Sequence, residues 1–163
     1  MKNVNIVRRS FLPAIIVLSA WGSLAVAADE RTAPGRTGWP SFRQNPEQTG
    51  VAVSTLPSKL EKLWEAELGD QILGGAAILG DRVYVPCLSG SLFCLDKANG
   101  KTIWTYRTVE VVAANSFAPG FKSAPTVTDA VVYLGDDAGV FHAIDRATGK
   151  ALWKFESGGD IVG

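Results

Sequence analysis

The sequence has 163 residues, 47% of them hydrophobic and 20% charged, and its 16 lysines and arginines balance 16 aspartates and glutamates. This composition is ordinary for a soluble globular protein. The balanced charge provides no broad positive field of the kind that attracts a phosphate backbone, so we expect no nucleic-acid partner.

The N-terminus has the organisation of a secretory signal peptide. Lys2, Arg8 and Arg9 precede an apolar run over residues 11–27, and this run ends in small residues suited to cleavage. An uncleaved membrane anchor is the alternative, because the run reaches the lower length limit for a helix that spans a bilayer. No cysteine follows the run directly, so no lipid anchor is evident. We predict a signal peptide over residues 1–27 and a mature protein that is periplasmic or secreted.

The next segment, residues 28–58, is interrupted repeatedly by proline and glycine, which prevent a regular element from running far. We interpret it as an extended leader that lies across a surface of the folded domain. Trp39 and Phe42 are its expected anchors, because buried aromatic side chains contribute large apolar areas. A disordered tail is the alternative.

From residue 59 onward the chain repeats itself with a period of 49 residues. Eight positions are identical in the two copies without a gap: Val83 and Val132, Tyr84 and Tyr133, Gly90 and Gly139, Asp96 and Asp145, Ala98 and Ala147, Gly100 and Gly149, Lys101 and Lys150, and Trp104 and Trp153. Each copy consists of short apolar runs separated by turn residues, a pattern typical of four β-strands. The expected strands cover residues 76–79, 82–86, 91–95 and 101–107 in the first copy, and 124–127, 131–135, 140–144 and 150–155 in the second.

Both copies carry the motif D-x-x-[TN]-G-K before the last expected strand. Its aspartates, Asp96 and Asp145, can accept backbone N–H bonds within a turn, and Thr148 stands at the fourth position of the second motif. Gly100 and Gly149 can adopt the positive φ that lets the chain reverse direction. We interpret both aspartates as turn-forming residues, because a catalytic carboxylate would not be expected once in every repeat.

A tryptophan follows the glycine of the motif by four residues in both copies, as Trp104 and Trp153. A four-stranded sheet cannot cover its own faces, so it stacks against another sheet, and a bulky flat side chain fills the space between them. We predict that both tryptophans pack between neighbouring sheets.

Cys87 and Cys94 are the only two cysteines of the sequence. If residues 89–90 form a two-residue hairpin turn, Cys87 faces Leu92 and Cys94 faces Val85, which makes the two sulfurs diagonal neighbours. A disulfide and two unpaired thiols are both compatible with this arrangement.

The sequence shows no recognisable catalytic or metal-binding arrangement. Two thiols and the distant His142 do not make a ligand set with metal-binding spacing. A cysteine, a histidine and a carboxylate are not spaced for nucleophilic catalysis either. We therefore predict no catalytic, cofactor-binding or metal-binding residue in this chain.

The stretches CLDKANGKTIW, residues 94–104, and AIDRATGKALW, residues 143–153, resemble the repeat of the pyrroloquinoline-quinone-type (PQQ-like) β-propellers, whose members share the tryptophan-docking motif A-x-D-x-x-T-G-x-x-x-W. The second copy matches this motif throughout, whereas the first has Cys94 in place of alanine and Asn99 in place of threonine. The resemblance covers residues 59–163 and implies radial blades of four antiparallel strands each. We expect an all-β fold, a partial β-propeller of two such blades, after the signal peptide and the leader.

A third, partial copy precedes the two blades. Residues 64–74, WEAELGDQILG, align with residues 153–163, WKFESGGDIVG, so that Trp64 matches Trp153. We predict one lone outer strand around Trp64. Because propellers have about four to eight blades, closing the ring needs further blades or further copies, and we expect the sequence to be the N-terminal part of a longer protein.

The connection between the two blades is nine residues longer than the matching connection before the first blade. Its Phe117, Phe121 and Lys122 make it a candidate surface for a protein partner. A packed surface loop is the alternative.

The resemblance implies two classes of function. One is a non-catalytic exported scaffold of the BamB-like branch, without a cofactor, whose loops hold other proteins of the cell envelope. The other is the N-terminal part of a quinoprotein dehydrogenase that binds pyrroloquinoline quinone and calcium and oxidises alcohols or sugars. Such dehydrogenases resemble one another in a pair of adjacent cysteines near the quinone, whereas Cys87 and Cys94 are seven positions apart. We therefore favour the scaffold.

A carbohydrate-binding module is a third class of function. It would require exposed aromatic platforms, but most aromatic residues here occupy repeat positions where packing is expected.

Overall fold

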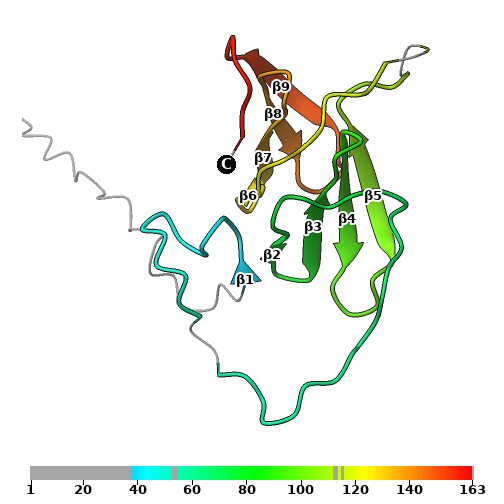
Figure 1. Ribbon diagram of the computed structural model, residues 1–163. Helices are drawn as coiled ribbons and strands as arrows, with labels where there is room; N and C mark the ends of the chain where they lie inside the picture. The colour runs from blue at the N-terminus through cyan, green and yellow to red at the C-terminus, as the bar shows by residue number, and fades with distance from the viewer. Residues whose placement is uncertain (1–37, 53–54, 112–113, 115, 163) are drawn as a thin grey trace, which may run out of the picture. The chain divides into compact units, whose positions relative to one another are not determined.

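The computed structural model describes residues 38–52, 55–111, 114 and 116–162. The predicted signal peptide and the first part of the predicted leader lie outside these residues. The described residues form nine β-strands, which are arranged in two antiparallel sheets (Figure 1). No helix in this part of the chain is long and apolar enough to cross a membrane.

The first sheet has the strand order β1-β2-β3-β4-β5, and the second has the order β6-β7-β8-β9. The strands of the first sheet are β1 (Gly38–Trp39), β2 (Ala77–Leu79), β3 (Arg82–Pro86), β4 (Ser91–Asp96) and β5 (Thr102–Arg107). Those of the second are β6 (Thr126–Val127), β7 (Val131–Gly135), β8 (Val140–Asp145) and β9 (Ala151–Glu156). Strands β2 to β9 correspond to the four strands predicted for each copy of the repeat. The expected all-β fold of two four-stranded antiparallel blades is therefore confirmed.

The two copies fold alike down to one local irregularity. The register between β4 and β5 shifts between Cys94 and Leu95, and the register between β8 and β9 shifts between Ala143 and Ile144. These sites are equivalent in the repeat, so both copies carry the same β-bulge just before the D-x-x-[TN]-G-K turn. A bulge increases the local twist of the strand pair, which helps the sheet to present a twisted face to its neighbour.

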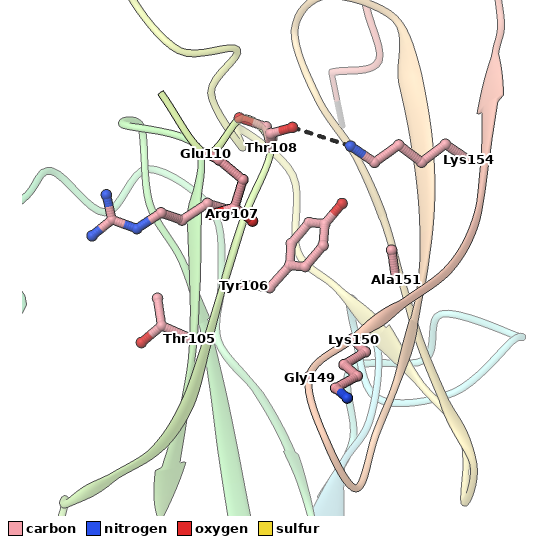
Figure 2. A pocket seen from close by; sticks show the side chains of 9 residues that line it. All are labelled: Thr105, Tyr106, Arg107, Thr108, Glu110, Gly149, Lys150, Ala151 and Lys154. Carbon is pink, nitrogen blue, oxygen red and sulfur yellow. Dashed lines mark hydrogen bonds between the residues drawn. The ribbon is translucent and has the colours of Figure 1, made fainter. Parts of the chain in front are cut away.

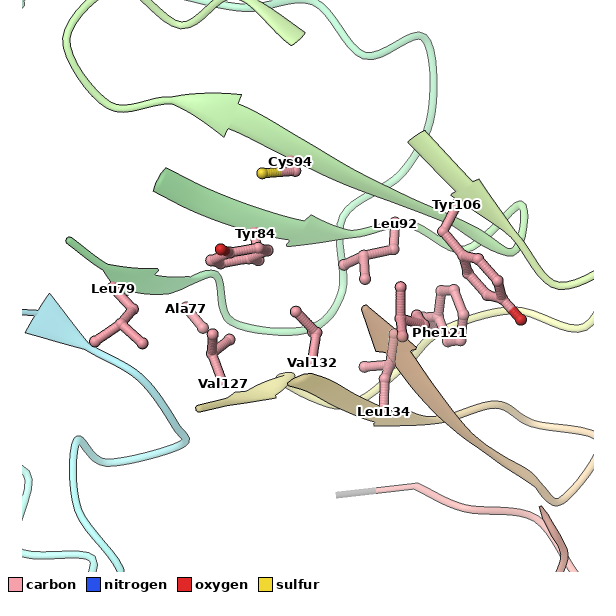
Figure 3. Packing of buried hydrophobic residues seen from close by; sticks show 11 residues of the cluster. Ala77, Leu79, Tyr84, Leu92, Cys94, Tyr106, Phe121, Val127, Val132 and Leu134 are labelled. Carbon is pink, nitrogen blue, oxygen red and sulfur yellow. The ribbon is translucent and has the colours of Figure 1, made fainter. Parts of the chain in front are cut away.

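The main core lies between the two sheets (Figure 3). Side chains from β2 to β5 interdigitate there with side chains from β6 to β8 and from the connection that precedes β6. The buried members are Ala77, Leu79, Tyr84, Leu92, Cys94, Tyr106, Phe121, Val127, Val132, Leu134 and Ile144, with Trp104 packed against them. Because this cluster draws on both sheets, each sheet is needed to bury the facing side of the other.

The segment around Trp64 covers the opposite face of the first sheet. Trp64, Ala66 and Leu68, which are spaced as on one side of an extended strand, pack on a second cluster that includes Val83 and Leu95. Among the described residues this segment pairs with no strand. It nevertheless occupies the position that the predicted outer strand requires.

The described part of the leader contributes the short strand β1. Trp39 pairs with Ile78 of β2 and Gly38 pairs with Leu79, so the leader adds a fifth strand to the first sheet. Phe42 is 60% exposed and does not act as the second anchor that we expected. The chain turns away from the sheet directly after Pro40, within a segment whose Arg43 and Gln44 have positive φ, and this turn carries Phe42 into solvent.

The second sheet is covered on one face only by the described residues. Trp153 and Phe155 on its other face are 49% and 63% exposed. Their counterparts in the first sheet, Trp104 and Tyr106, lie against the second sheet and are largely covered. The exposed face of the second sheet is therefore equivalent to the face that the first sheet buries.

Candidate functional site

The two D-x-x-[TN]-G-K turns have nearly the same geometry. Oδ1 of Asp96 accepts hydrogen bonds from the backbone N–H groups of Ala98 and Asn99, at 2.8 and 3.1 Å. Oδ1 of Asp145 accepts from the backbone N–H and the hydroxyl of Thr148, at 2.8 and 2.6 Å. Hydrogen bonds from Thr148 hold the pKa of Asp145 below its ordinary value. Both carboxylates are therefore engaged within their own turns.

Each turn is also the docking point for the tryptophan of the preceding blade. Gly149 has a φ of 74°, and a Cβ atom built on it would lie only 2.6 Å from Cδ2 of Trp104. The indole N–H of Trp104 donates to the carbonyl oxygen of Arg146 in the same turn, at 3.1 Å. Glycine is thus required twice over, since any side chain would meet the indole and would also strain the left-handed backbone.

Trp64 makes the same contacts with the turn of the first blade. A Cβ atom on Gly100 would lie 2.5 Å from Cε3 of Trp64, and the Trp64 indole donates to the carbonyl oxygen of Lys97 at 2.7 Å. The docking of a tryptophan on the next turn therefore occurs twice in the described residues. Trp153 is the third member of this series, and half of it remains exposed.

Arg146 strengthens the contact between the blades from the same turn. Its Nε donates to the hydroxyl oxygen of Tyr84 at 2.8 Å, and its Nη2 donates to the carbonyl oxygen of Leu79 at 3.1 Å. The equivalent residue Lys97 reaches only the carbonyl oxygen of Gly80 in its own blade. Lys97 and Arg146 are both basic residues at equivalent positions of the two copies, and the sequence alone does not show this difference.

The long connection between the blades places its three candidate partner residues in different environments. Phe117 is 97% exposed. Phe121 is fully buried in the main core, where its ring meets His142 edge-on at 5.6 Å between centroids. This corrects the expectation for Phe121, which anchors the connection and leaves no surface for a partner.

Lys122 also contributes to anchoring this connection. Its Nζ lies 3.0 Å from Oδ2 of Asp137 in the turn between β7 and β8. Burial alone would raise the pKa of Asp137, but hydrogen bonds from Lys122 and from the Gly120 N–H hold it below its ordinary value. Phe117 consequently stands on a connection that is fixed to the second sheet at its C-terminal end.

The two cysteines lie on opposite faces of the first sheet. Tyr84 pairs with Cys94 and Pro86 pairs with Leu92, and the N–H of Cys87 donates to the carbonyl oxygen of Ser91, so the loop contains residues 88–90 and the register differs by one residue from the expected one. Cys94 belongs to the core between the sheets, whereas Cys87 belongs to the cluster under Trp64. Both are free, and burial raises the pKa of each thiol to about 11. The geometry excludes the disulfide that the sequence left open.

A cleft of about 420 Å³ opens between β5 of the first sheet and the β8–β9 turn and β9 of the second (Figure 2). It is lined by Thr105, Tyr106, Arg107, Thr108, Glu110, Gly149, Lys150, Ala151 and Lys154. Nζ of Lys154 donates to the carbonyl oxygen of Thr108 at 3.1 Å and so bridges the two sheets. The cationic side chains do not converge on one point, so the cleft has no evident anion site.

Sequence reasoning did not single out the buried polar group formed by Tyr106, His142 and Asp136 between the sheets. A signal for it was present, because the first copy has Phe93 where the second has His142, and Cys87 where the second has Asp136. A polar pair at two apolar repeat positions marks an individual feature of the second blade.

The part of the chain that contains the repeats is similar to known proteins. A family model described as outer membrane protein assembly factor BamB matches residues 60–163. The outer membrane protein assembly factor BamB of Burkholderia pseudomallei is 31% identical over 108 residues, which cover 66% of this chain and 26% of that protein. The quinohemoprotein alcohol dehydrogenase ADH IIB of Pseudomonas putida is 30% identical over 151 residues, which cover 89% of this chain and 19% of that protein.

Among solved structures, the quinohemoprotein alcohol dehydrogenase of Comamonas testosteroni superposes with a TM-score of 0.53 at 21% identity, over 74% of this chain and 19% of that chain. This likeness concerns the fold alone. The chain therefore spans about a quarter or less of the length of the relatives named here.

Proposed function

The chain belongs to the family of PQQ-like β-propeller repeats described as outer membrane protein assembly factor BamB, and on that basis we propose that it acts as an exported, non-catalytic protein-interaction scaffold of the cell envelope. The predicted signal peptide over residues 1–27 supports export to the periplasm or beyond. N-terminal sequencing of the protein recovered from the periplasm tests this step, and a chain that begins at Ala28 is the expected result.

Phe117 carries the scaffold proposal. A phenylalanine that is 97% exposed contributes nothing to the described core, and Val111 on the same connection is also 84% exposed. The connection is fixed at its C-terminal end by the buried Phe121 and by the ion pair of Lys122, which follow Phe117 closely in the sequence. Exposed aromatic side chains on an anchored loop are suited to contact another protein.

Photo-crosslinking in the native host tests this proposal. A photoreactive amino acid at position 117 of the exported full-length protein should form adducts with one or a few envelope proteins. The same amino acid at position 61, where the native Glu61 is also exposed, serves as the matched control. Adducts that are equal at both positions, or absent at position 117 in a correctly exported protein, would contradict the scaffold role of this connection.

The exposed face of the second sheet supports a second contact, with a further repeat unit. Trp64 and Trp104 each dock on the turn of the following blade, whereas Trp153 has no such turn among the described residues. A further unit with its own D-x-x-[TN]-G-K turn would bury Trp153 and Phe155 as the second sheet buries Trp104 and Tyr106. The ring would then close through further blades or further copies.

The alternative function is that of a quinoprotein dehydrogenase that uses pyrroloquinoline quinone and calcium, and the similarity to the Pseudomonas putida enzyme favours it. The described residues do not fit these groups. They contain no cluster of three or more histidine, cysteine, aspartate or glutamate side chains that could hold a metal ion, and Cys87 and Cys94 lie on opposite faces of a sheet. Alcohol-dependent reduction of a dye by the full-length protein, supplied with the quinone and calcium, would replace the scaffold proposal by this one.

A further inference from the structure

A chain of three polar side chains is buried between the two sheets. The hydroxyl of Tyr106 in β5 lies 2.9 Å from Nδ1 of His142 in β8, and Nε2 of His142 lies 2.9 Å from Oδ2 of Asp136, which follows β7. Tyr106 is 7% exposed, and His142 and Asp136 are each 1% exposed. The chain therefore joins the first sheet to the second through groups that have almost no access to water.

The repeat shows that the architecture does not require this chain. The first blade fills the positions of Asp136 and His142 with Cys87 and Phe93, which pack in an apolar cluster. Placing a carboxylate and an imidazole in a core costs desolvation energy that apolar residues avoid. The polar pair is therefore specific to the contact between these two sheets.

The hydrogen bonds assign one protonation state to the group. Oδ1 of Asp136 already accepts from the backbone N–H groups of Ala138 and Val140, at 3.0 and 2.8 Å, so Oδ2 accepts from Nε2–H of His142. Nδ1 of a neutral His142 then accepts the hydroxyl proton of Tyr106. Burial raises the pKa of Tyr106 to about 12, so this hydroxyl stays protonated and remains a donor. With a neutral imidazole every member of the chain is satisfied.

Protonation of His142 breaks this arrangement. A second ring proton on Nδ1 has to be donated to the oxygen of Tyr106, so the hydroxyl proton of Tyr106 loses its acceptor. Burial lowers the pKa of His142, and although Asp136 opposes this effect, the nearby charge of Lys154 adds to it. The folded state therefore disfavours the proton, whereas the unfolded chain binds it at about pH 6.5.

The groups around His142 come from every element that packs on it. Asp136 approaches from the β7–β8 turn and Tyr106 from β5, while Lys154 of β9 lies 5.8 Å from the centroid of the Tyr106 ring. The connection before β6 contributes the apolar Phe121, and the charge of Glu110 acts on Tyr106 from the end of the first sheet. Asp136 is thus the one anion in direct contact with the imidazole.

We propose that Tyr106, His142 and Asp136 form an acid-sensitive latch between the two sheets, closed while His142 is neutral and released when His142 is protonated. The sign follows from proton binding. The unfolded state binds more protons than the folded state below about pH 6.5, so stability is complete above that pH and is lost as the pH falls. The unfolding equilibrium constant should rise by up to about tenfold for each pH unit below 6.5 until the folded state is protonated.

His142 is the only histidine of the sequence, so NMR of ¹⁵N-histidine-labelled protein observes it directly. In the full chain at pH 7.5 we expect a neutral imidazole protonated on Nε2, and a titration midpoint below 6.5. After correction for the intrinsic pH dependence of exchange, hydrogen exchange of β5 and β8 should accelerate as the pH falls from 7.5 to 5.5, because release of the latch exposes the contact between the sheets. An imidazolium at pH 7.5, the other tautomer, or exchange that does not follow the titration of His142 would each overturn the proposal.

The matched control restores the residues of the repeat at all three positions. The variant Tyr106→Phe, Asp136→Cys and His142→Phe carries the side chains found at the equivalent positions Phe155, Cys87 and Phe93. It should show the same hydrogen exchange in β5 and β8 at pH 5.5 as at pH 7.5, after correction for the intrinsic pH dependence of exchange. Acid-accelerated exchange equal to that of the native chain would show that other groups release the sheets and would refute the latch. The titration of His142 in the native chain decides the question even where this variant does not fold.

Discussion

Replacing Gly149 by alanine would place a methyl group where the indole of Trp104 now lies. The added Cβ atom would be 2.6 Å from Cδ2 and 2.8 Å from Cε3 of Trp104, whereas ordinary van der Waals contact begins at 3.4 Å. The backbone at Gly149 also has a φ of 74°, a conformation that side chains of L-residues rarely adopt. Two separate penalties therefore fall on this single methyl group.

The two penalties can be given magnitudes. The left-handed backbone costs a residue with a Cβ atom about 1 to 2 kcal/mol, and overpacking against a fixed ring costs about 1 to 3 kcal/mol. The free energy of unfolding should fall by about 2 to 5 kcal/mol in total. Gly158→Ala is the matched control, because Gly158 has a φ of 78° but nothing within 4 Å of the added methyl group. It should lose only the first of the two amounts.

Urea unfolding of both variants and the native chain, followed by tryptophan fluorescence and circular dichroism, measures this difference. We expect Gly149→Ala to be less stable than Gly158→Ala by about 1 to 3 kcal/mol at an unchanged denaturant slope. A difference in the free energy of unfolding smaller than about 0.5 kcal/mol would mean that Trp104 can move away from the added methyl group without loss of stability. The docking of the indole on the turn would then not hold the two blades together.

Three further predictions concern neighbouring features. Arg146→Met removes two hydrogen bonds from the second blade to the first and should lower the free energy of unfolding by about 2 kcal/mol, and an unchanged urea midpoint would contradict this. Cys87 and Cys94, whose pKa values burial raises to about 11, should react with a thiol reagent at pH 8 only after unfolding in urea, and rapid labelling of the native chain would show that the sheets open. Trp104→Ala should lower the free energy of unfolding by about 3 kcal/mol, because Trp104 packs against the core between the sheets. Trp153→Ala should lower it by less than about 1 kcal/mol in the isolated chain, because half of Trp153 is exposed there. Equal losses of stability in the two variants would contradict this difference in burial.

The repeat made the fold predictable from the sequence. Strand positions recur every 49 residues with turn residues between them, so even the ends of β3 and β7 could be predicted from the letters alone. The register of the β3–β4 turn was the exception. A three-residue turn and a two-residue turn are both compatible with the same apolar pattern, and only the structure shows that Cys87 lies opposite Ser91 and not opposite Leu92.

The candidate site was less predictable, because its features depend on contacts between residues that are distant in the sequence. The sequence does not indicate that Phe121 is buried in the core and Phe117 is exposed, because both are phenylalanines of the same connection. The pairing of Tyr106 with His142 is equally invisible to a comparison within one repeat, since the two residues come from different copies. Aligning the two copies does reveal the positions at which they differ, and Asp136 and His142 of the latch lie at two such positions.

The docking of each tryptophan has a direction. Trp64 and Trp104 donate to carbonyl oxygens that lie 33 and 42 residues further along the chain, and in both cases the indole precedes the turn that receives it. A chain that crosses a membrane with its N-terminus first would therefore deliver each indole before the turn that covers it. Such a chain can add blades one at a time, and every new blade needs only its immediate predecessor as a template, so the barrier to folding need not grow with the size of the ring.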